Sequence, residues 1–190
     1  MVRVLEDYAI KHNIPIMQKD GIEFMCDYIK KSHVKTILEI GTAIGYSAVN
    51  MALVDKNIKI TTVERDINMY TKAIENIKKF NLENQIEVIH SDALDVNLDS
   101  KYDLIFIDAA KSQYINFFEK FKYNLNDNGV IITDNLSFHG MVLDDTLTHN
   151  RNTKQMIKKI RKYIDFLKNN EDFHTDFYTV GDGISITKRS

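Results

Sequence analysis

Apolar positions change their spacing along the chain, and each change marks the boundary of a predicted element. Compact, β-branched runs predict strands over residues 36–40, 59–64, 86–90, 102–108 and 130–134. Apolar residues at helical spacing, or the segments between those runs, predict helices over 2–13, 20–31, 46–55, 67–80, 113–125 and 152–168. Two more strand-like runs, 175–180 and 184–188, flank Gly181-Asp182-Gly183 and predict a β-hairpin.

The alternation of strands and helices predicts a parallel α/β sheet with helices on both faces, closed at one edge by the antiparallel hairpin. The middle of 102–108 is almost entirely apolar, as in a strand covered on both faces. We expect Asp20 to cap the second helix and residues 126–129 to form a turn. Residues 136–151 lack a clean period and contain Gly140, which predicts a mobile substrate flap.

Composition narrows the class of protein. At 190 residues, with neither repeat nor linker, the chain reads as one domain over 1–190. A net charge of −2 excludes a general attraction to nucleic acid or membrane, so any basic surface must be local. We expect neither a signal peptide nor a membrane span. We interpret the single cysteine, Cys26, as a buried core thiol. These features favour a reducing, cytoplasmic location.

The segment Glu39-Ile-Gly-Thr-Ala-Ile-Gly-Tyr-Ser47 follows the first strand of the sheet and leads into a helix. A strand, a glycine turn and a helix form the first half of a nucleotide-binding βαβ unit, in which Gly41 would let a ligand approach the backbone. Glu64 ends the next strand, where an acid can bind both ribose hydroxyls, and Asp92 could accept from an adenine amino group. The alternative for both acids is a solvated loop position.

A pair of acids gives the sharper signal. Asp108 and Asp134 end strands expected to be neighbours, which lie about 5 Å apart in a sheet. Two carboxylates so close repel each other unless a cation lies between them, and Asn135 adds an amide oxygen suited to Mg²⁺. Lys111 would face the same crevice as a general base or as a partner for an anionic oxygen. The alternatives are two independent loop acids and a solvated lysine.

Residues 151–168 form the one strongly basic stretch. They carry seven lysines and arginines against a single acid, Asp165. Such a stripe can follow a phosphate backbone, which would make RNA a partner. The alternative is the solvated face of a packed helix.

Four segments together resemble the cation-dependent O-methyltransferases of the catechol and caffeoyl-CoA type: 39–47, Val63-Glu-Arg-Asp66, Ile107-Asp-Ala-Ala-Lys111 and Ile132-Thr-Asp-Asn135. Within that family, 108–114, 133–140 and 180–184 are most similar to the bacterial enzymes that methylate 5-hydroxyuridine in tRNA. The resemblance implies a class I methyltransferase (Rossmann-like) fold with a seven-stranded sheet. It also implies a homodimer, because the family's leading helices, here residues 1–33, commonly support dimerisation and cover the pocket.

The resemblance also implies site residues. Those expected to bind S-adenosylmethionine (SAM) are Glu39, Gly41, Thr42, Gly45, Tyr46, Ser47, Glu64, Asp92, Ala93 and Asp108. Asp108, Asp134 and Asn135 fall on the metal ligands, and Lys111 on the catalytic lysine. The predicted activity is SAM- and Mg²⁺-dependent methylation of the 5-hydroxyl of 5-hydroxyuridine in tRNA, giving 5-methoxyuridine. A catechol-type enzyme for small molecules is the alternative. A nicotinamide-dependent oxidoreductase is more distant, because it expects a full G-x-G-x-x-G turn and has no use for the paired acids.

Overall fold

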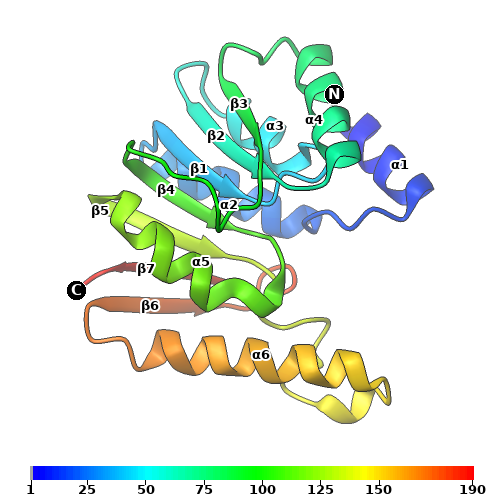
Figure 1. Cartoon of the computed structure of the whole chain (residues 1–190), viewed down its shortest axis with the longest axis vertical. Coiled ribbons are helices and arrows are strands. Elements are labelled where there is room, and N and C mark those ends of the chain that lie inside the picture. The colour runs from blue at the N-terminus through cyan, green and yellow to red at the C-terminus, as the bar shows by residue number, and fades with distance from the viewer. Residues whose placement is uncertain (1) are drawn as a thin grey trace.

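A computed structural model describes residues 2–190 and contains a seven-stranded sheet in the order β3-β2-β1-β4-β5-β7-β6 (Figure 1). The strands are β1 (Thr36–Ile40), β2 (Lys59–Glu64), β3 (Ile86–His90), β4 (Tyr102–Ile107), β5 (Leu125–Thr133), β6 (Phe173–Tyr178) and β7 (Ile184–Arg189). The first five strands pair in parallel, whereas β7 is antiparallel to both β5 and β6. The predicted mostly parallel sheet with an antiparallel terminal hairpin is confirmed.

Helices cover both faces of this sheet. The α-helices are α1 (Arg3–His12), α2 (Lys19–Lys31), α3 (Tyr46–Ala52), α4 (Ile67–Lys79), α5 (Tyr114–Phe121) and α6 (Arg151–Lys168). Short 3-10 turns lie at η1 (Lys111–Gln113), η2 (Lys122–Asn124) and η3 (Asp145–Leu147). One apolar cluster joins the sheet to α1 through α4, and a second joins it to α5 and α6. Figure 1 shows α6 as the outermost element at one end of the molecule, beside β6.

The central strands are apolar on both sides because each face meets helices. Along β1, Ile37 belongs to the first cluster and Leu38 and Ile40 to the second, as the alternation of side chains in a strand requires. All three side chains are fully buried. The parallel strands β1, β4 and β5 therefore bring their carboxyl ends to one edge of the sheet, which is where α/β folds bind ligands.

Two local predictions were wrong because a contact between distant segments prevailed over a local preference, and the bounds of one predicted helix differ. Residues 126–129 belong to β5, since Leu125 pairs with Tyr102 and a register shift absorbs the irregular segment. The helix predicted over 113–125 is the short α5 between η1 and η2. Gln18, not Asp20, is the N-cap residue of α2; the Asp20 carboxylate instead accepts a 3.1 Å bond from the backbone N–H of Gly181.

Cys26, predicted to be a buried core thiol, is half-buried in the structure. It packs against the first apolar cluster, and burial raises the pKa of its thiol to about 11. Across residues 2–190, none of the helices is both long and apolar enough to cross a membrane. The homodimer, the cytoplasmic location and the mobility of the flap stay predictions.

Candidate functional site

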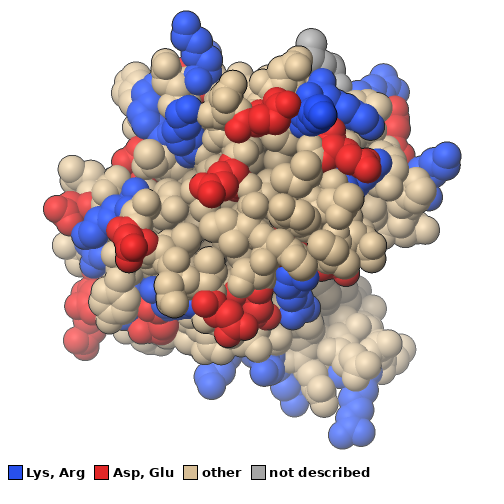
Figure 2. All heavy atoms as spheres, turned by 45° about the horizontal axis from the view of Figure 1, so that its top comes forward, with Lys and Arg blue, Asp and Glu red and all other residues tan. Residues whose placement is uncertain are grey.

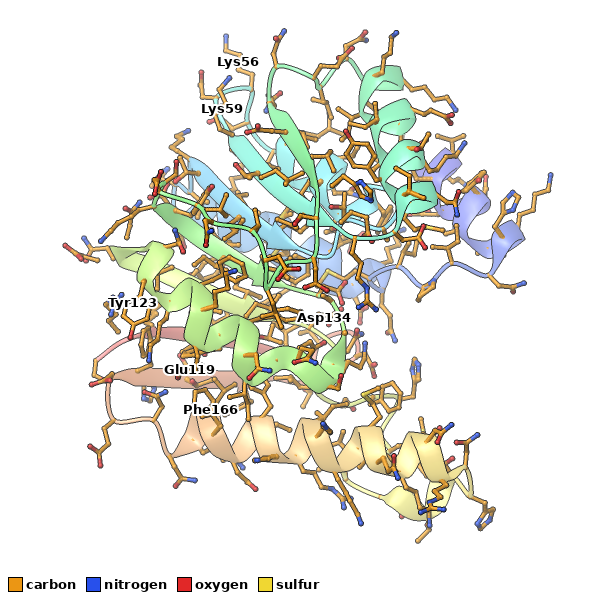
Figure 3. All side chains as sticks on the ribbon, in the orientation of Figure 1. Lys56, Lys59, Glu119, Tyr123, Asp134 and Phe166 are labelled. Carbon is orange, nitrogen blue, oxygen red and sulfur yellow. The ribbon has the colours of Figure 1, made fainter. Side chains whose placement is uncertain are left out.

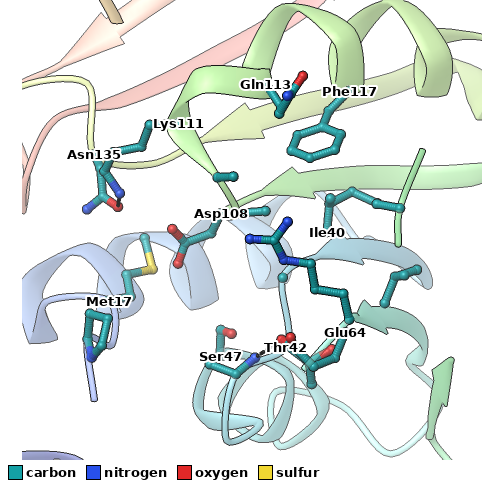
Figure 4. A pocket seen from close by; sticks show the side chains of 18 of the residues that line it. Met17, Ile40, Thr42, Ser47, Glu64, Asp108, Lys111, Gln113, Phe117 and Asn135 are labelled. Atoms are coloured by element: carbon teal, nitrogen blue, oxygen red, sulfur yellow. Dashed lines mark hydrogen bonds between the residues drawn. The ribbon is translucent and has the colours of Figure 1, made fainter. Parts of the chain in front are cut away.

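A cavity of about 460 Å³ opens at the carboxyl ends of β1, β2, β3 and β4 (Figure 4). Eight of the ten residues predicted to bind SAM line it: Gly41, Thr42, Tyr46, Ser47, Glu64, Asp92, Ala93 and Asp108. Lys111 and Asn135 line the same cavity. In Figure 4, Asp108 lies between the Lys111–Asn135 pair on one side and Ser47, Thr42 and Glu64 on the other. One end of the cavity therefore has the residues expected to bind a nucleoside, and the other end is acidic. The two ends meet at Asp108.

The glycine turn shapes the first end. Gly41 has a φ of 101°, and a Cβ atom there would lie 2.3 Å from the carbonyl oxygen of Asp108, so only glycine fits. Gly45 has a φ of 81°, packs against Ala73 and starts α3, but it does not line the cavity. The turn thus brings β1 and the end of β4 into close backbone contact beneath the cavity.

Glu39 lies behind the cavity wall rather than in it. Its side chain is fully buried and accepts hydrogen bonds from the hydroxyl groups of Ser47 and, at 2.6 Å, Thr62. Burial raises the pKa of Glu39 to about 8, and the two hydroxyl donors only partly offset this effect. In this arrangement Glu39 orients Ser47, which does line the cavity.

Glu64 ends β2, which is next to β1, and Asp92 follows β3, the strand beyond β2 in the sheet. One carboxylate oxygen of Glu64 accepts a 2.8 Å hydrogen bond from the backbone N–H of Ala43, which connects the end of β2 to the glycine turn. The other oxygen accepts from the backbone N–H of Asp66. Each carboxylate oxygen retains a lone pair that a ligand hydroxyl could use. Asp92 accepts from the N–H of Leu94 in its own turn and lies 3.9 Å from Arg65, which also lines the cavity.

Asp108 and Asp134 follow β4 and β5, which pair in parallel as predicted. Figure 3 labels Asp134 at the end of β5. Burial, and for Asp134 the charge of Asp108, raises the pKa of both carboxyl groups, while Lys111 acts in the opposite direction. Asp134 is almost fully buried, and across the described chain no group lies within hydrogen-bond reach of its Oδ1 atom.

Asn135 connects these acids to the lysine. Its Oδ1 atom accepts a 2.6 Å hydrogen bond from Lys111 Nζ, and its Nδ2 atom donates to Asp134 Oδ2 at 3.3 Å. The backbone is left-handed at this position, with a φ of 62°, a conformation that asparagine tolerates. Asp108, Asn135 and Lys111 therefore line one end of the cavity. Asp134 does not line it and lies buried behind Asn135.

Other cavity residues were missed from the sequence. The connector between α1 and α2 contributes residues 15–18, and the segment after β5 contributes Phe138 and His139. Asp182, in the β6–β7 turn, is 4% exposed and its Oδ2 atom accepts from Asn135 Nδ2 at 3.4 Å. The signal available in the sequence was an acid between two glycines, which reads as an ordinary turn.

The basic helix lies beside this site. α6 packs against η1, the turn that carries Lys111. Its exposed lysines and arginines project from the lower edge of the molecule in Figure 2, and a hollow near its start is lined by His149, Arg151, Lys154, Gln155 and Lys158. The Nε atom of Arg161 donates to the Val142 carbonyl at 2.8 Å, which attaches the segment after β5 to the helix.

Comparison with known proteins agrees with this geometry. The profile of the O-methyltransferase family matches residues 1–190. The chain belongs to the O-methyltransferase family. This confirms the predicted enzyme class, a SAM-dependent O-methyltransferase, and the class I methyltransferase fold.

Two relatives and one structural neighbour are similar to this chain. A Staphylococcus aureus protein provisionally assigned as a caffeoyl-CoA O-methyltransferase is 38% identical, with a TM-score of 0.94 over 100% of this chain and 92% of that one. An Arabidopsis thaliana protein with the same provisional assignment is 30% identical over 90% of this chain and 76% of its own. A Podospora anserina methyltransferase bound to S-adenosylhomocysteine (SAH) is 22% identical, with a TM-score of 0.85 over 92% of this chain and 80% of that one.

Proposed function

We propose that this O-methyltransferase transfers the methyl group of SAM to a hydroxyl oxygen that is held beside a divalent cation, with 5-hydroxyuridine in tRNA as the acceptor. The observation that carries the proposal is the acidic end of the cavity, which Asp108, Asn135 and Lys111 line and behind which the buried Asp134 contacts Asn135. The other end, formed by the glycine turn and Glu64, is the part of the cavity expected to bind a nucleoside, which supports SAM as the ligand there.

The residues present fit a divalent cation. Among the described residues, Asp134 Oδ1 is buried without a hydrogen-bond partner, an arrangement that costs free energy unless a ligand satisfies the oxygen. Asp108 and Asp134 raise the cost further because two buried carboxylates repel each other. Together with the amide oxygen of Asn135 they form an all-oxygen donor set, which suits Mg²⁺ or a similar hard cation.

The chain's own residues then account for the rest of the reaction. When bound, the cation supplies a Lewis acid that lowers the pKa of the acceptor hydroxyl, while the SAM sulfonium supplies the methyl group. Glu64 and the glycine turn hold the donor at one end. Lys111 Nζ takes up the hydroxyl proton if it is the neutral amine, and neutralises the resulting oxyanion if it is the ammonium ion. The products are the methyl ether, SAH and one proton. Positioning the oxygen in line with the methyl group provides much of the rate enhancement.

The helix α6 is the element that favours an RNA acceptor. Its exposed lysines lie on the helix that packs against the turn bearing Lys111, so an RNA held by α6 would be close to the cavity. A phosphate backbone is the ligand expected for a stripe of lysines and arginines on a protein whose net charge is −2. The sequence resemblance at 108–114, 133–140 and 180–184 points to the same acceptor.

A small-molecule acceptor is the second candidate, favoured by the provisional caffeoyl-CoA assignments of the S. aureus and A. thaliana relatives. It would use the same acidic end, because a catechol also offers two adjacent oxygens. It would leave the basic face of α6 without a role in catalysis.

The deciding experiment follows label from SAM into tRNA carrying 5-hydroxyuridine and into a simple catechol, each with Mg²⁺ and with a chelator. We expect chelator-sensitive labelling of the tRNA well above that of the catechol. Chelator-sensitive labelling of the catechol alone would overturn the tRNA acceptor and retain the cation. Labelling that survives full chelation would overturn the role of the cation.

A further inference from the structure

Asp182 lies at the junction of three segments. Its carboxylate accepts from Asn135 Nδ2 at 3.4 Å through Oδ2 and from the backbone N–H of His139 through Oδ1. Its carbonyl oxygen accepts a 2.7 Å bond from the N–H of Ser137. Only 4% of the residue is exposed, and neither the fold nor the reaction described above requires an acid at this point.

The backbone around Asp182 is built for close approach. At Gly183, where φ is 86°, a Cβ atom would lie 2.7 Å from the nitrogen of Ser137. At Gly181 a Cβ atom would lie 3.3 Å from the Cα atom of Gly21, and the Gly181 N–H donates to Asp20. The β6–β7 turn is therefore fixed between α2 and residues 135–139, which leaves the Asp182 side chain little freedom.

The first effect of Asp182 is on the orientation of the Asn135 amide. The Nδ2 atom of Asn135 faces two carboxylates, those of Asp134 and Asp182, while Oδ1 faces the Lys111 ammonium group. Carboxylates accept hydrogen bonds only, so they hold the amide nitrogen on their side. The amide oxygen is thereby presented to the acidic end of the cavity.

The second effect is on the segment after β5. Phe138 and His139 are both left-handed, with φ values of 47° and 57°, which is costly for residues with bulky side chains. The bond from the His139 N–H to Asp182 offsets part of that cost. The turn it closes carries the Phe138 ring, whose centre lies 5.8 Å from Lys111 Nζ.

From these contacts we infer that Asp182 is a positioning residue: its carboxylate orients Asn135 toward the cation site and fixes the 137–140 turn beside Lys111. The inference rests on the proposed function, because it gives the orientation of Asn135 a purpose only if a cation binds there. Asp182 acts through Asn135 and the turn and need not touch the cation itself. Residues of this kind around metal ligands commonly change metal affinity by about 10–100-fold when replaced.

Asp182→Asn tests the first effect without changing the size of the side chain. The His139 N–H still requires an oxygen, so the new amide nitrogen would face Asn135 Nδ2, and two donors would oppose each other. Asn135 then turns its oxygen away from the cavity. We expect Mn²⁺, measured by the electron paramagnetic resonance signal of the free ion, to bind about 10–100-fold more weakly. SAH affinity by calorimetry should stay close to that of the wild type.

A double-mutant cycle separates this effect from a merely structural one. In the Asp182→Asn background, Asn135→Asp places a carboxylate opposite the new amide nitrogen at position 182, so an acceptor again faces a donor. In the wild-type background the same change places a third carboxylate beside those of Asp134 and Asp182. The gain in Mn²⁺ affinity should therefore be at least about tenfold larger in the variant background. Equal gains in the two backgrounds would contradict the inference.

Asp182→Ala tests the second effect, because it removes the acceptor of the His139 N–H. Hydrogen exchange over 137–140 should accelerate in this variant and stay close to wild type in Asp182→Asn. Asp176→Asn, an exposed acid in the same hairpin, serves as the control and should change neither exchange nor Mn²⁺ binding.

Unchanged Mn²⁺ affinity in Asp182→Asn overturns the inference alone. A wild-type protein that binds no Mn²⁺ overturns the proposed function and the inference with it.

Discussion

Lys111 Nζ donates a 2.6 Å hydrogen bond to Asn135 Oδ1, across the crevice between the ends of β4 and β5. The two residues are 24 positions apart in sequence and come from segments that meet only because those strands pair. The proposed catalytic amine and a proposed cation ligand therefore hold each other in place. The chemistry of the site depends on the pairing of β4 with β5.

Replacing Lys111 with Met should lower kcat by about 10²–10⁴-fold, the usual loss when a group that moves a proton is removed. The apolar stem is retained, so SAH affinity should change little. The measurement is methyl transfer from labelled SAM at saturating acceptor. Lys101→Met, at an exposed position before β4, is the matched control and should keep wild-type activity. A Lys111 variant with more than about a tenth of the wild-type kcat would remove the lysine from the mechanism.

Cation binding should stabilise the fold through Asp134. At a cation concentration about 100 times Kd, linkage adds about 2.7 kcal/mol to the free energy of unfolding. For a chain of this size, that corresponds to a rise in Tm of about 5–10 °C. Asp134→Asn should abolish the rise, whereas Asp165→Asn, an exposed position on α6, should preserve it. Differential scanning calorimetry with Mg²⁺ and with chelator provides the values, and an equal rise in the Asp134 variant would contradict the prediction.

Glu39 should make stability depend on pH. Its pKa rises from an ordinary value of 4.5 to about 8 on folding, so between these values the folded chain keeps a proton that the unfolded chain releases. The contribution of Glu39 to stability therefore falls as pH rises through this window, by at most about 1.4 kcal/mol per unit. Glu39→Gln removes the titration, so its stability relative to wild type should increase from pH 5 to pH 8.

Urea unfolding at four pH values measures this difference for Glu39→Gln. Glu83→Gln, an exposed position before β3, is the control, and its difference from wild type should be flat across the same window. A flat difference for Glu39→Gln as well would mean that the buried carboxyl group does not hold its proton.

Glu64→Gln should weaken SAH binding by about 10–100-fold, since hydrogen bonds to a charged group contribute about 1.5–3 kcal/mol. The new amide nitrogen would also oppose one of two backbone donors, the N–H of Ala43 or of Asp66. Isothermal titration calorimetry with SAH measures the affinity. Glu87→Gln, at an exposed position on the neighbouring strand β3, should bind as wild type does. Wild-type affinity in Glu64→Gln would exclude a role for this acid in holding the donor.

The sequence predicted those parts of the site that depend on strand ends. Asp108 and Asp134 were found because each closes a compact apolar run, and parallel strands bring their carboxyl ends to one edge. Glu64 was found in the same way, from the end of β2. Glu39 and Gly45 were predicted to bind SAM because they belong to the segment 39–47, but neither lines the cavity. Glu39 lies behind the cavity wall, and Gly45 lies at the start of α3.

What escaped prediction depends on contacts between distant segments. Asp182 reaches Asn135 across 47 positions, and Asp20 reaches Gly181 across 161, so local turn and cap preferences misread both acids. The Asn126–Gly129 segment carries strong turn residues, yet pairing of Leu125 with Tyr102 incorporates it into β5. In these three cases a contact with a residue far away in sequence determined the structure, and the local turn and cap preferences did not.

The basic face of α6 should hold the phosphate backbone of tRNA. Replacing Lys158, Lys159 and Lys162 with Gln removes three exposed charges, which should leave catechol methylation and thermal stability unchanged. If tRNA is the acceptor, its KM should rise, and the dependence of log KM on log salt should become shallower. The slope should change by up to about 0.7–0.9 for each phosphate that the helix no longer neutralises.

The matched control removes three exposed lysines far from this face, at positions 56, 78 and 79. Figure 3 labels Lys56 at the end of the molecule opposite α6. This control triple variant should retain the wild-type salt slope, because its lysines lie away from the cavity. Two equal slopes in the α6 variant and the wild type would mean that the helix contacts no phosphate. The lysine stripe would then be a solvated face without a role in binding tRNA.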